Sequence, residues 1–433
     1  MSIQTLITNQ KKNFLTLNRS AKLWLLVIIM SSVFFAGWEL FFNLYILAKG
    51  FDKEFLGMAN SAYPAAVLLF GIPMGMLSDK IGRKNSLLIG QAFFLVTFLI
   101  VALTSNPTVI LVMMFSCGIG DALFIVSESP LLAQLSNNKN RNYLFSLNWG
   151  LGTLSRMVGN YLAGQLPLGF ERIFSFQSGT AMSYQAVLLT SVGLTFLTFI
   201  PLLMIKLPEN ANKRDENGDP VEKPLENGSR QNLRNILKKR LIWKFFIPNI
   251  QIGLGAALII PYLNLYFVEN FDLSDQALGT LFSIAALVTG LSSLASPSLA
   301  NKLGTRIRAV VAAQGTSILF LLLLGFSPIA GVAMIAFLAR SALMNMGNPL
   351  FESFSMDQVS EEERGAFNSV LILSWELGWV IGPLISGFVQ ESYGFAPLFI
   401  ATAVLYSSGV ALIWRFFRDH ETVGIEEAVL QTT

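Results

Sequence analysis

The sequence is poor in charge: Asp, Glu, Lys and Arg make up only 13% of its 433 residues, while 53% are hydrophobic. A soluble domain carries roughly 25% charge, so the composition excludes an ordinary soluble protein. One cysteine, Cys117, excludes a disulfide framework and a cysteine metal site. One histidine, His420, excludes a multi-histidine metal site. We therefore expect a membrane protein with neither a metal nor another cofactor.

Three further classes of function are disfavoured. A net charge of +3 is too small to indicate a nucleic-acid partner. An enzyme is disfavoured because the sequence shows neither a nucleophile–base pair nor a phosphate-cradling loop. The first apolar run is long and begins only after Lys22, which favours a retained membrane span over a signal peptide.

Apolar runs of about 20 residues recur along the chain, and this length crosses roughly 30 Å of hydrocarbon. Backbone groups in lipid must bond internally, so these runs predict helices. We expect an all-α polytopic membrane protein with twelve helices at 23–48, 55–78, 85–104, 107–134, 142–166, 181–206, 243–269, 276–298, 306–326, 328–356, 365–390 and 394–417.

The distribution of bases predicts the orientation. With the N-terminus placed inside, 25 of the 30 Lys and Arg fall in cytoplasmic segments, three in outer loops and two within spans. The positive-inside rule then puts both termini in the cytoplasm of a multi-pass cell-membrane protein.

The expected domains are an N-terminal six-helix bundle (1–206), a cytoplasmic linker (207–242) and a C-terminal six-helix bundle with a short tail (243–433). Around 210–229 the linker has a disordered composition. The basic stretch 230–240 has two interpretations: a surface helix on anionic lipid, or a solvated segment that merely obeys the positive-inside rule.

The two halves repeat one another. Asn43-Leu44-Tyr45 recurs as Asn264-Leu265-Tyr266, each followed by Phe-Asp and then by Gly57 or Gly279. Arg141, Ser146, Gly159 and Gly164 recur at a constant spacing as Arg364, Ser369, Gly382 and Gly387. Six helices have therefore been duplicated in parallel orientation, as in secondary transporters that place substrate between the halves.

A charged turn, Gly75-Met76-Leu77-Ser78-Asp79-Lys80-Ile81-Gly82-Arg83-Lys84, has a weaker copy at 297–306, where Asn301 replaces the acid. On Gly75, Leu77, Asp79, Gly82, Arg83 and Lys84, with Ser78 and Lys80 as departures, the chain resembles a major facilitator superfamily transporter over essentially its full length. The resemblance implies two six-helix bundles, alternating access and a cavity lined mainly by helices 1, 4, 7 and 10.

We interpret this turn as a cytoplasmic gate formed by Gly75, Asp79, Gly82, Arg83 and Lys84. Gly75 would let two helices approach closely, and Gly82 would permit a tight turn. Asp79 would pair with nearby bases and, by the resemblance, with the start of helix 11. The alternative is that the bases only set topology.

Charged residues within spans are costly and usually pair or face water. Glu39, Glu376 and Asp121 are our candidates for proton coupling, with Glu39 first because no base lies close to it in sequence. The alternative for Glu376 is a satisfied buried acid. We expect Arg156 to pair with Asp121 or Glu128.

Asp121 and Arg340 occupy equivalent positions in the two repeats. Either they pair or grip a polar substrate together, or each is paired within its own bundle. The expected substrate cavity comprises Trp38, Asn43, Asp121, Glu128, Arg156, Asn264, Arg340, Asn345, Trp375 and Trp379. For its tryptophans the competing interpretation, which we slightly favour, is core packing.

The leading hypothesis is a monomeric, proton-coupled exporter of a small organic molecule, driven by the proton gradient. The antiporter motif of the family is incomplete in helix 5 (Ser155, Gly159, Asn160) and better matched in helix 11 (Gly378, Gly382, Pro383). The alternatives are a proton-driven nutrient importer, and a non-transporting sensor or lipid scramblase on the same scaffold.

Overall fold

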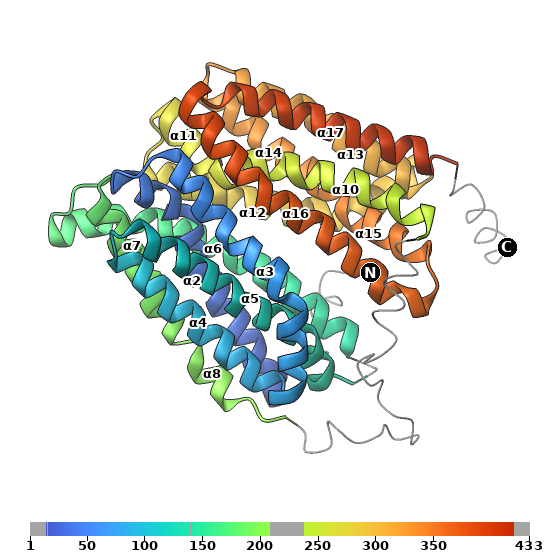
Figure 1. Ribbon diagram of the computed structural model, residues 1–433, viewed down its shortest axis with the longest axis horizontal. Coiled ribbons are helices and arrows are strands. Elements are labelled where there is room, and N and C mark those ends of the chain that lie inside the picture. Colours follow the sequence, from blue (N-terminus) through green and yellow to red (C-terminus); the bar gives the residue numbers. More distant parts are fainter. Residues whose placement is uncertain (1–13, 15, 138–139, 208–237, 420–433) are drawn as a thin grey trace, which may run out of the picture. The chain divides into compact units, whose positions relative to one another are not determined.

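The structure is a computed structural model that describes residues 14, 16–137, 140–207 and 238–419. Within these ranges every regular element is a helix, and the ribbon in Figure 1 consists of long rods joined by short turns. Residues 208–237 and 420–433 lie outside the described residues; they include His420, the predicted disordered part of the linker and most of its predicted surface helix.

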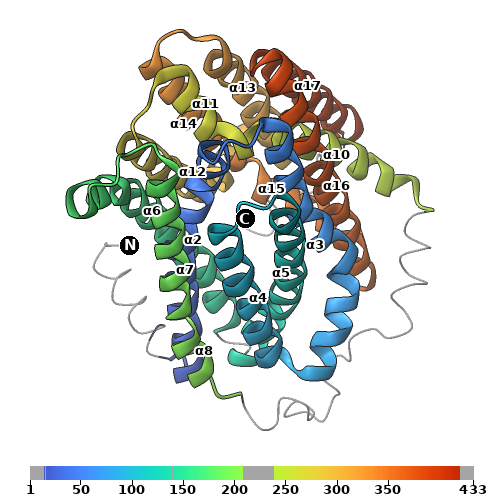
Figure 2. The ribbon, with the colours of Figure 1, turned by 60° about the vertical axis from the view of Figure 1, so that its left-hand side comes forward.

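The chain divides into two compact units. The first contains most of the N-terminal helices, whose bounds are α2 (Arg19–Ala48), α3 (Lys53–Ile81), α4 (Arg83–Leu103), α5 (Pro107–Leu135), α6 (Arg141–Phe174), α7 (Ala181–Phe196) and α8 (Phe199–Met204). Here α4 packs along α5, as Figure 2 shows, and α2 packs against α6 and α7. Fully buried Trp24 and Phe41 of α2 lie in this core.

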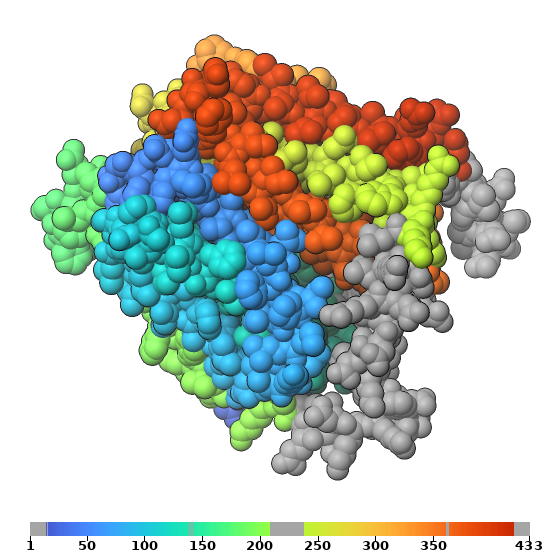
Figure 3. Space-filling view, viewed as in Figure 1, coloured from blue at the N-terminus to red at the C-terminus, as the bar shows by residue number. Residues whose placement is uncertain are grey.

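The second unit contains most of the C-terminal helices. Their bounds are α10 (Arg240–Ile259), η1 (Ile260–Tyr262), α11 (Leu263–Phe271), α12 (Asp275–Leu303), α13 (Arg306–Phe326), α14 (Ala330–Met346), α15 (Asn348–Asp357), α16 (Glu361–Tyr393) and α17 (Ala396–Phe417). The helix α10 packs on α16 and α17, and the space-filling view shows the atoms of α10 and α16 in contact (Figure 3).

Eleven helical stretches of the described residues are long and apolar enough to cross a membrane. The twelfth expected span is α6, which is helical but less apolar because it carries Asn148, Arg156 and Asn160 among several glycines. The helix also continues to Phe174, beyond the expected end at 166. The all-α fold and the number of long helices are therefore confirmed, and α6 is the expected span that is not among the eleven.

Two helix starts belong to the opposite unit from the rest of their helix. Residues 51–61, with the first turns of α3, are part of the second unit, and residues 275–283, with the first turns of α12, are part of the first. In the second unit a Cβ at Gly57 would lie 3.2 Å from the Cα of Gly387, and in the first a Cβ at Gly279 would lie 2.6 Å from the Cα of Gly164. These are the glycines matched by the repeat, so the duplication preserved two equivalent close helix contacts.

The repeated tyrosines also make equivalent bonds. The Tyr45 hydroxyl donates to the carbonyl of Ala102 near the end of α4, and the Tyr266 hydroxyl donates to the carbonyl of Leu324 near the end of α13. Both tyrosines are buried. A buried hydroxyl needs a partner, and both repeats satisfy it with the late carbonyls of the third helix.

Candidate functional site

The most deeply placed acid of the first unit is Asp121, in the middle of α5. It is 9% exposed, and the hydroxyl of Tyr63, on α3, donates a hydrogen bond to its carboxylate. Gly118, one turn before Asp121, lets α5 approach α3, because a Cβ there would lie 2.2 Å from the Tyr63 carbonyl oxygen. This close packing holds Tyr63 against the acid, so a neutral hydroxyl faces a buried carboxyl.

A second acid, Glu39 of α2, forms an ion pair with Arg156 of α6. Their closest N–O distance is 3.1 Å, and the side chains are 51% and 47% exposed. The prediction that Arg156 pairs with Asp121 or Glu128 is therefore wrong: the packing of α2 on α6 brings Glu39 to it, although the two are far apart in sequence. A half-exposed ion pair inside spans indicates a face that water reaches, since lipid does not accommodate exposed charges.

Glu128 lies two turns beyond Asp121 on α5 and has a different environment. The side-chain amide of Asn148, on α6, donates to Glu128 at 2.9 Å, and its oxygen accepts from the Trp24 indole, also at 2.9 Å. A short polar chain therefore links three helices, with a half-buried carboxyl at its end. This arrangement orients Glu128 through neutral donors.

The second unit contains a buried cation, Arg340 of α14, which is 4% exposed. One terminal nitrogen donates to the Tyr406 hydroxyl of α17 at 3.1 Å, and the guanidinium lies 6.0 Å from the centre of the same ring. Its Nε has no hydrogen-bond partner within the described part of the chain. Arg340 thus retains an unused donor, which is the property expected of a group that binds an anionic or carbonyl oxygen.

Asp121 and Arg340 are each held by a tyrosine of their own unit. Pairing within each bundle was one of the two alternatives for these residues, and these bonds are of that kind. The joint grip on a substrate stays a prediction.

The predicted aromatic lining divides into two classes. Trp38 is 4% exposed and stacks on Phe98 with ring centres 3.8 Å apart. It is a core residue, so its assignment to a cavity wall is corrected, because the stack removes it from any accessible surface. Trp375 and Trp379 of α16 are half-buried, with ring centres 6.3 Å apart, and Glu376 between them is half-buried too.

The predicted asparagines also differ. Asn43 and Asn264 are buried in the two repeats. Asn345 is half-buried beside the break between α14 and α15, and its amide donates to the Ser341 carbonyl. Of the three, Asn345 is the most accessible to a ligand.

In the charged turn, Arg83 donates to the Asp79 carboxylate and, at 2.8 Å, to the Ser78 hydroxyl. The expected pairing of Asp79 with a nearby base is present. Ser78 is in turn 2.7 Å from Ser127 of α5, so the turn is tied to the bundle. Gly82 has a φ of +85°, which favours glycine.

Two other gate residues complete this picture. The Lys84 ammonium donates to the carbonyls of Leu203 and Ile205 at 2.7 and 2.6 Å, where it caps the end of α8. A Cβ at Gly75 would meet no atom within 4 Å. The close approach predicted for Gly75 is therefore wrong, because the helix face at this point is open.

The second copy of the turn uses a different acid. Asn301 replaces the aspartate, and Arg306 instead donates to Asp357 of α15 at 2.7 Å. Gly304 keeps the positive φ, +82°, of the first copy. The backbone of the turn is thus similar in the two repeats, but the second copy has Thr305 in place of Arg83, and the base at its last position, Arg306, pairs with an acid of a neighbouring helix.

Sequence reasoning missed three polar partners: Tyr63, Tyr406 and, as the donor to Glu128, Asn148. Tyr63 and Tyr406 are single hydroxyls in apolar spans, with no charge or spacing that marks them. Only helix packing reveals them.

Comparison with known proteins agrees with this helical membrane fold. A family model described as Major Facilitator Superfamily matches residues 24–338 and again 249–429, which together cover most of the chain. The chain belongs to the major facilitator superfamily. It is accordingly a multi-pass membrane transporter, and the family is one of transporters rather than enzymes.

The transporter resembles curated drug-resistance proteins at low identity. It is 24% identical over 392 residues to the multidrug resistance protein MdtG of Proteus mirabilis, covering 87% of this chain and 90% of that one. It is 21% identical over 380 residues to the class H tetracycline resistance protein of Pasteurella multocida, covering 87% and 89%.

Solved structures show the same fold. The nucleoside transporter NupG aligns with a TM-score of 0.69 and 16% identity, covering 93% of this chain and 98% of that one. A bacterial homologue of the human lysosomal transporter Spinster aligns with a TM-score of 0.71 and 14% identity, covering 91% and 93%. At these identities the likeness concerns the fold alone.

Proposed function

We propose that this transporter exports a small amphipathic or polar organic molecule in exchange for protons. In this proposal it works by alternating access as a monomer in the cell membrane, with both termini cytoplasmic and no bound cofactor. The similarity to MdtG and to a tetracycline resistance protein over nearly nine-tenths of the chain supports a drug-like substrate and the outward direction.

The environment of Asp121 is the observation that carries proton coupling. It is a carboxyl buried at mid-span, and the group that donates a hydrogen bond to it is the Tyr63 hydroxyl rather than a base. Intramembrane acids of this kind form proton relays in pumps and transporters. A carboxyl held by Tyr63 can lose its proton without losing its partner, because a hydroxyl bonds both forms.

Glu39 was the first candidate for this role, but its ion pair with Arg156 makes it better suited to substrate binding. The pair is half exposed and presents both a donor and an acceptor on one face of the first unit. Trp149 of α6 is 77% exposed. The ion pair and this tryptophan together offer polar and aromatic contacts for an amphipathic ligand. In this proposal Asp121 carries the proton, and Glu39 and Arg156 contact the cargo.

Purified transporter in proteoliposomes tests the proposal with tetracycline and a lipophilic cation dye as probes. An antiporter accumulates the probe in vesicles with an acidic interior, and the accumulation collapses when a protonophore is added. Asp121→Asn is expected to abolish this dependence on the gradient. Glu352→Gln is the matched control, because Glu352 is an exposed acid in the middle of α15.

The rival functions give different results in the same vesicles. A proton-driven importer accumulates its probe when the interior is alkaline. A sensor moves no probe under either gradient, and a scramblase equilibrates a fluorescent lipid between leaflets without a gradient. Accumulation by Asp121→Asn equal to that of the wild type would contradict the assignment of the proton site.

A further inference from the structure

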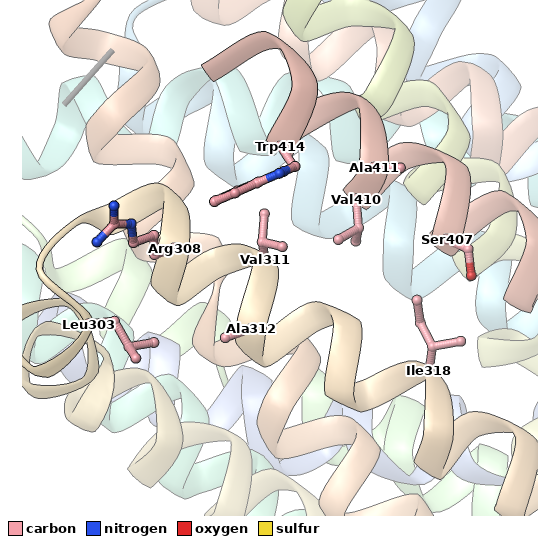
Figure 4. Close-up of a pocket in the computed structure, with 9 residues that line it drawn as sticks. All are labelled: Leu303, Arg308, Val311, Ala312, Ile318, Ser407, Val410, Ala411 and Trp414. Carbon is pink, nitrogen blue, oxygen red and sulfur yellow. The ribbon is translucent and has the colours of Figure 1, made fainter. Parts of the chain in front are cut away.

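An apolar groove lies on the second unit between α13 and α17, and its lining includes no residue assigned to transport. It encloses about 560 Å³ and is lined by Leu303, Arg308, Val311, Ala312, Ile318, Ser407, Val410, Ala411 and Trp414. Figure 4 shows Arg308 and Trp414 near one end and Ile318 and Ser407 at the other. Small residues on both helices, Ala312 and Ala411, leave the space open.

The length of the groove corresponds to half a bilayer. Arg308 and Ile318 are ten residues apart on one helix, which is about 15 Å at the rise of an α-helix. The hydrocarbon core of a membrane is roughly 30 Å thick, so one leaflet contributes about half of that. The groove therefore begins at the first turn of α13 and reaches the depth of one acyl chain.

The charged end of the groove is available for binding. Arg308 is exposed, and its guanidinium makes no hydrogen bond or ion pair with the described residues. Arg306, two residues earlier, is already paired with Asp357. Trp414 is 38% exposed, and its ring extends from α17 toward the side of Arg308 (Figure 4). This placement is typical of tryptophan at the level of lipid headgroups.

We propose that this groove, lined by α13 and α17, binds one anionic phospholipid from the leaflet at this end of the helices. The phosphate group lies against the Arg308 guanidinium, which is suited to bidentate contact with phosphate oxygens. One acyl chain lies along Val311, Ala312 and Val410. By the distribution of bases in the sequence, this is the cytoplasmic leaflet, whose lipids carry the negative charge.

Native mass spectrometry of the purified full-length transporter tests the proposal, titrated with phosphatidylglycerol or with phosphatidylcholine of the same chains. The wild type is expected to retain one phosphatidylglycerol more tightly than phosphatidylcholine. Arg308→Gln should weaken this phosphatidylglycerol roughly fivefold and leave phosphatidylcholine unchanged. Ala312→Phe should weaken both lipids by filling the groove.

Arg141→Gln is the matched control, since Arg141 is also an exposed arginine at the start of a helix but lies in the first unit. It should bind phosphatidylglycerol as the wild type does. If Ala312→Phe lowers the melting temperature without lipid, Ala411→Leu tests the same groove with a smaller change. Equal retention of the two lipids by the wild type, or undiminished phosphatidylglycerol binding by Arg308→Gln, would overturn the proposal.

Discussion

At the residue scale, the transporter stabilises its deepest charges with tyrosine hydroxyls. Tyr63 bonds Asp121 and Tyr406 bonds Arg340, each within one unit. An ion pair fixes the charge of both partners, whereas a hydroxyl leaves the acid able to exchange a proton and the arginine able to bind another oxygen. Both charged groups are thus buried, yet Asp121 can still exchange a proton and Arg340 can still bind another oxygen.

The pair of Glu39 and Arg156 should affect transport more than stability. Because both side chains are about half exposed, the pair is expected to contribute only about 0–1 kcal/mol to the free energy of unfolding. We predict that Glu39→Gln or Arg156→Gln shifts the melting temperature by at most a few degrees and lowers transport at least tenfold. Thermal unfolding and vesicle uptake, measured on the same preparations, check this; unfolding of either variant at room temperature would refute it.

Lys49, just after α2, gives a stability signal in the alkaline range. Partial burial lowers its pKa below the ordinary 10.5. Between the lowered pKa and 10.5 the unfolded chain binds more protons than the folded one, so stability rises with pH across this window. We predict that the wild type gains stability relative to Lys49→Gln as the pH is raised toward 10.5, measured by thermal unfolding. An identical pH dependence in both proteins would be inconsistent with this.

The sequence was sufficient to identify most charged and polar residues of the site but not their partners. Arg156 was paired with the wrong helix, because the contact of α2 with α6 cannot be read from either span alone. For Trp38, expected in the cavity with core packing as the alternative, the stack on Phe98 decides for the core. An aromatic residue in an apolar helix carries no sign of the face on which it lies.

At the scale of elements, close helix contacts depend on the glycines shared by the repeats. A Cβ at Gly57 would lie 2.5 Å from the carbonyl oxygen of Pro383, whereas one at Gly71 on the same helix would meet nothing within 4 Å. We predict that Gly57→Ala destabilises the protein by about 1–3 kcal/mol. Gly71→Ala, the matched control, should be neutral or stabilising by about 0.5–1 kcal/mol.

Melting temperatures of the two purified variants decide this prediction. Gly279→Ala should resemble Gly57→Ala, because its Cβ would lie 2.6 Å from the carbonyl oxygen of Asn160. Equal melting temperatures for Gly57→Ala and Gly71→Ala would show that the contact at Gly57 relaxes without cost.

The charged turn between α3 and α4 should act through its acid rather than through its total charge. Asp79 accepts a hydrogen bond from Arg83, whereas Lys80 is an exposed base of the same turn. We predict that Asp79→Asn lowers the transport rate at least tenfold while Lys80→Gln changes it less than twofold. Uptake rates normalised to the amount of reconstituted protein measure both; equal effects would favour the alternative that the turn only sets topology.

Helix positions were the most predictable elements, because long apolar runs leave few choices in lipid. The points at which a membrane-spanning helix is interrupted were not predicted. The chain breaks at η1, between α7 and α8, and at Gly347 between α14 and α15. These breaks depend on packing and local hydrogen bonds, such as that from Gln91 to Thr198, which the hydropathy of a span does not record.

At the scale of the whole molecule, the duplication visible in the sequence is also visible in the contacts. The tyrosines of the repeated Asn-Leu-Tyr motif bond equivalent helices, and the matched glycines form equivalent contacts. The membership of residues 51–61 and 275–283 in the opposite units was not foreseen, since both segments have the sequence of ordinary helix starts. The repeated sequence indicates that the two halves are equivalent, but it does not show which helix segments belong to the opposite unit.

Proton release on ligand binding tests the central claim most directly. Purified transporter in weakly buffered detergent, with a pH-sensitive dye, is mixed with tetracycline or a lipophilic cation while binding is followed by tryptophan fluorescence. The account predicts that the wild type and Asp121→Glu release protons on binding, and that Asp121→Asn binds the ligand without releasing any. Undiminished proton release by Asp121→Asn would contradict the assignment of Asp121 as the coupling acid.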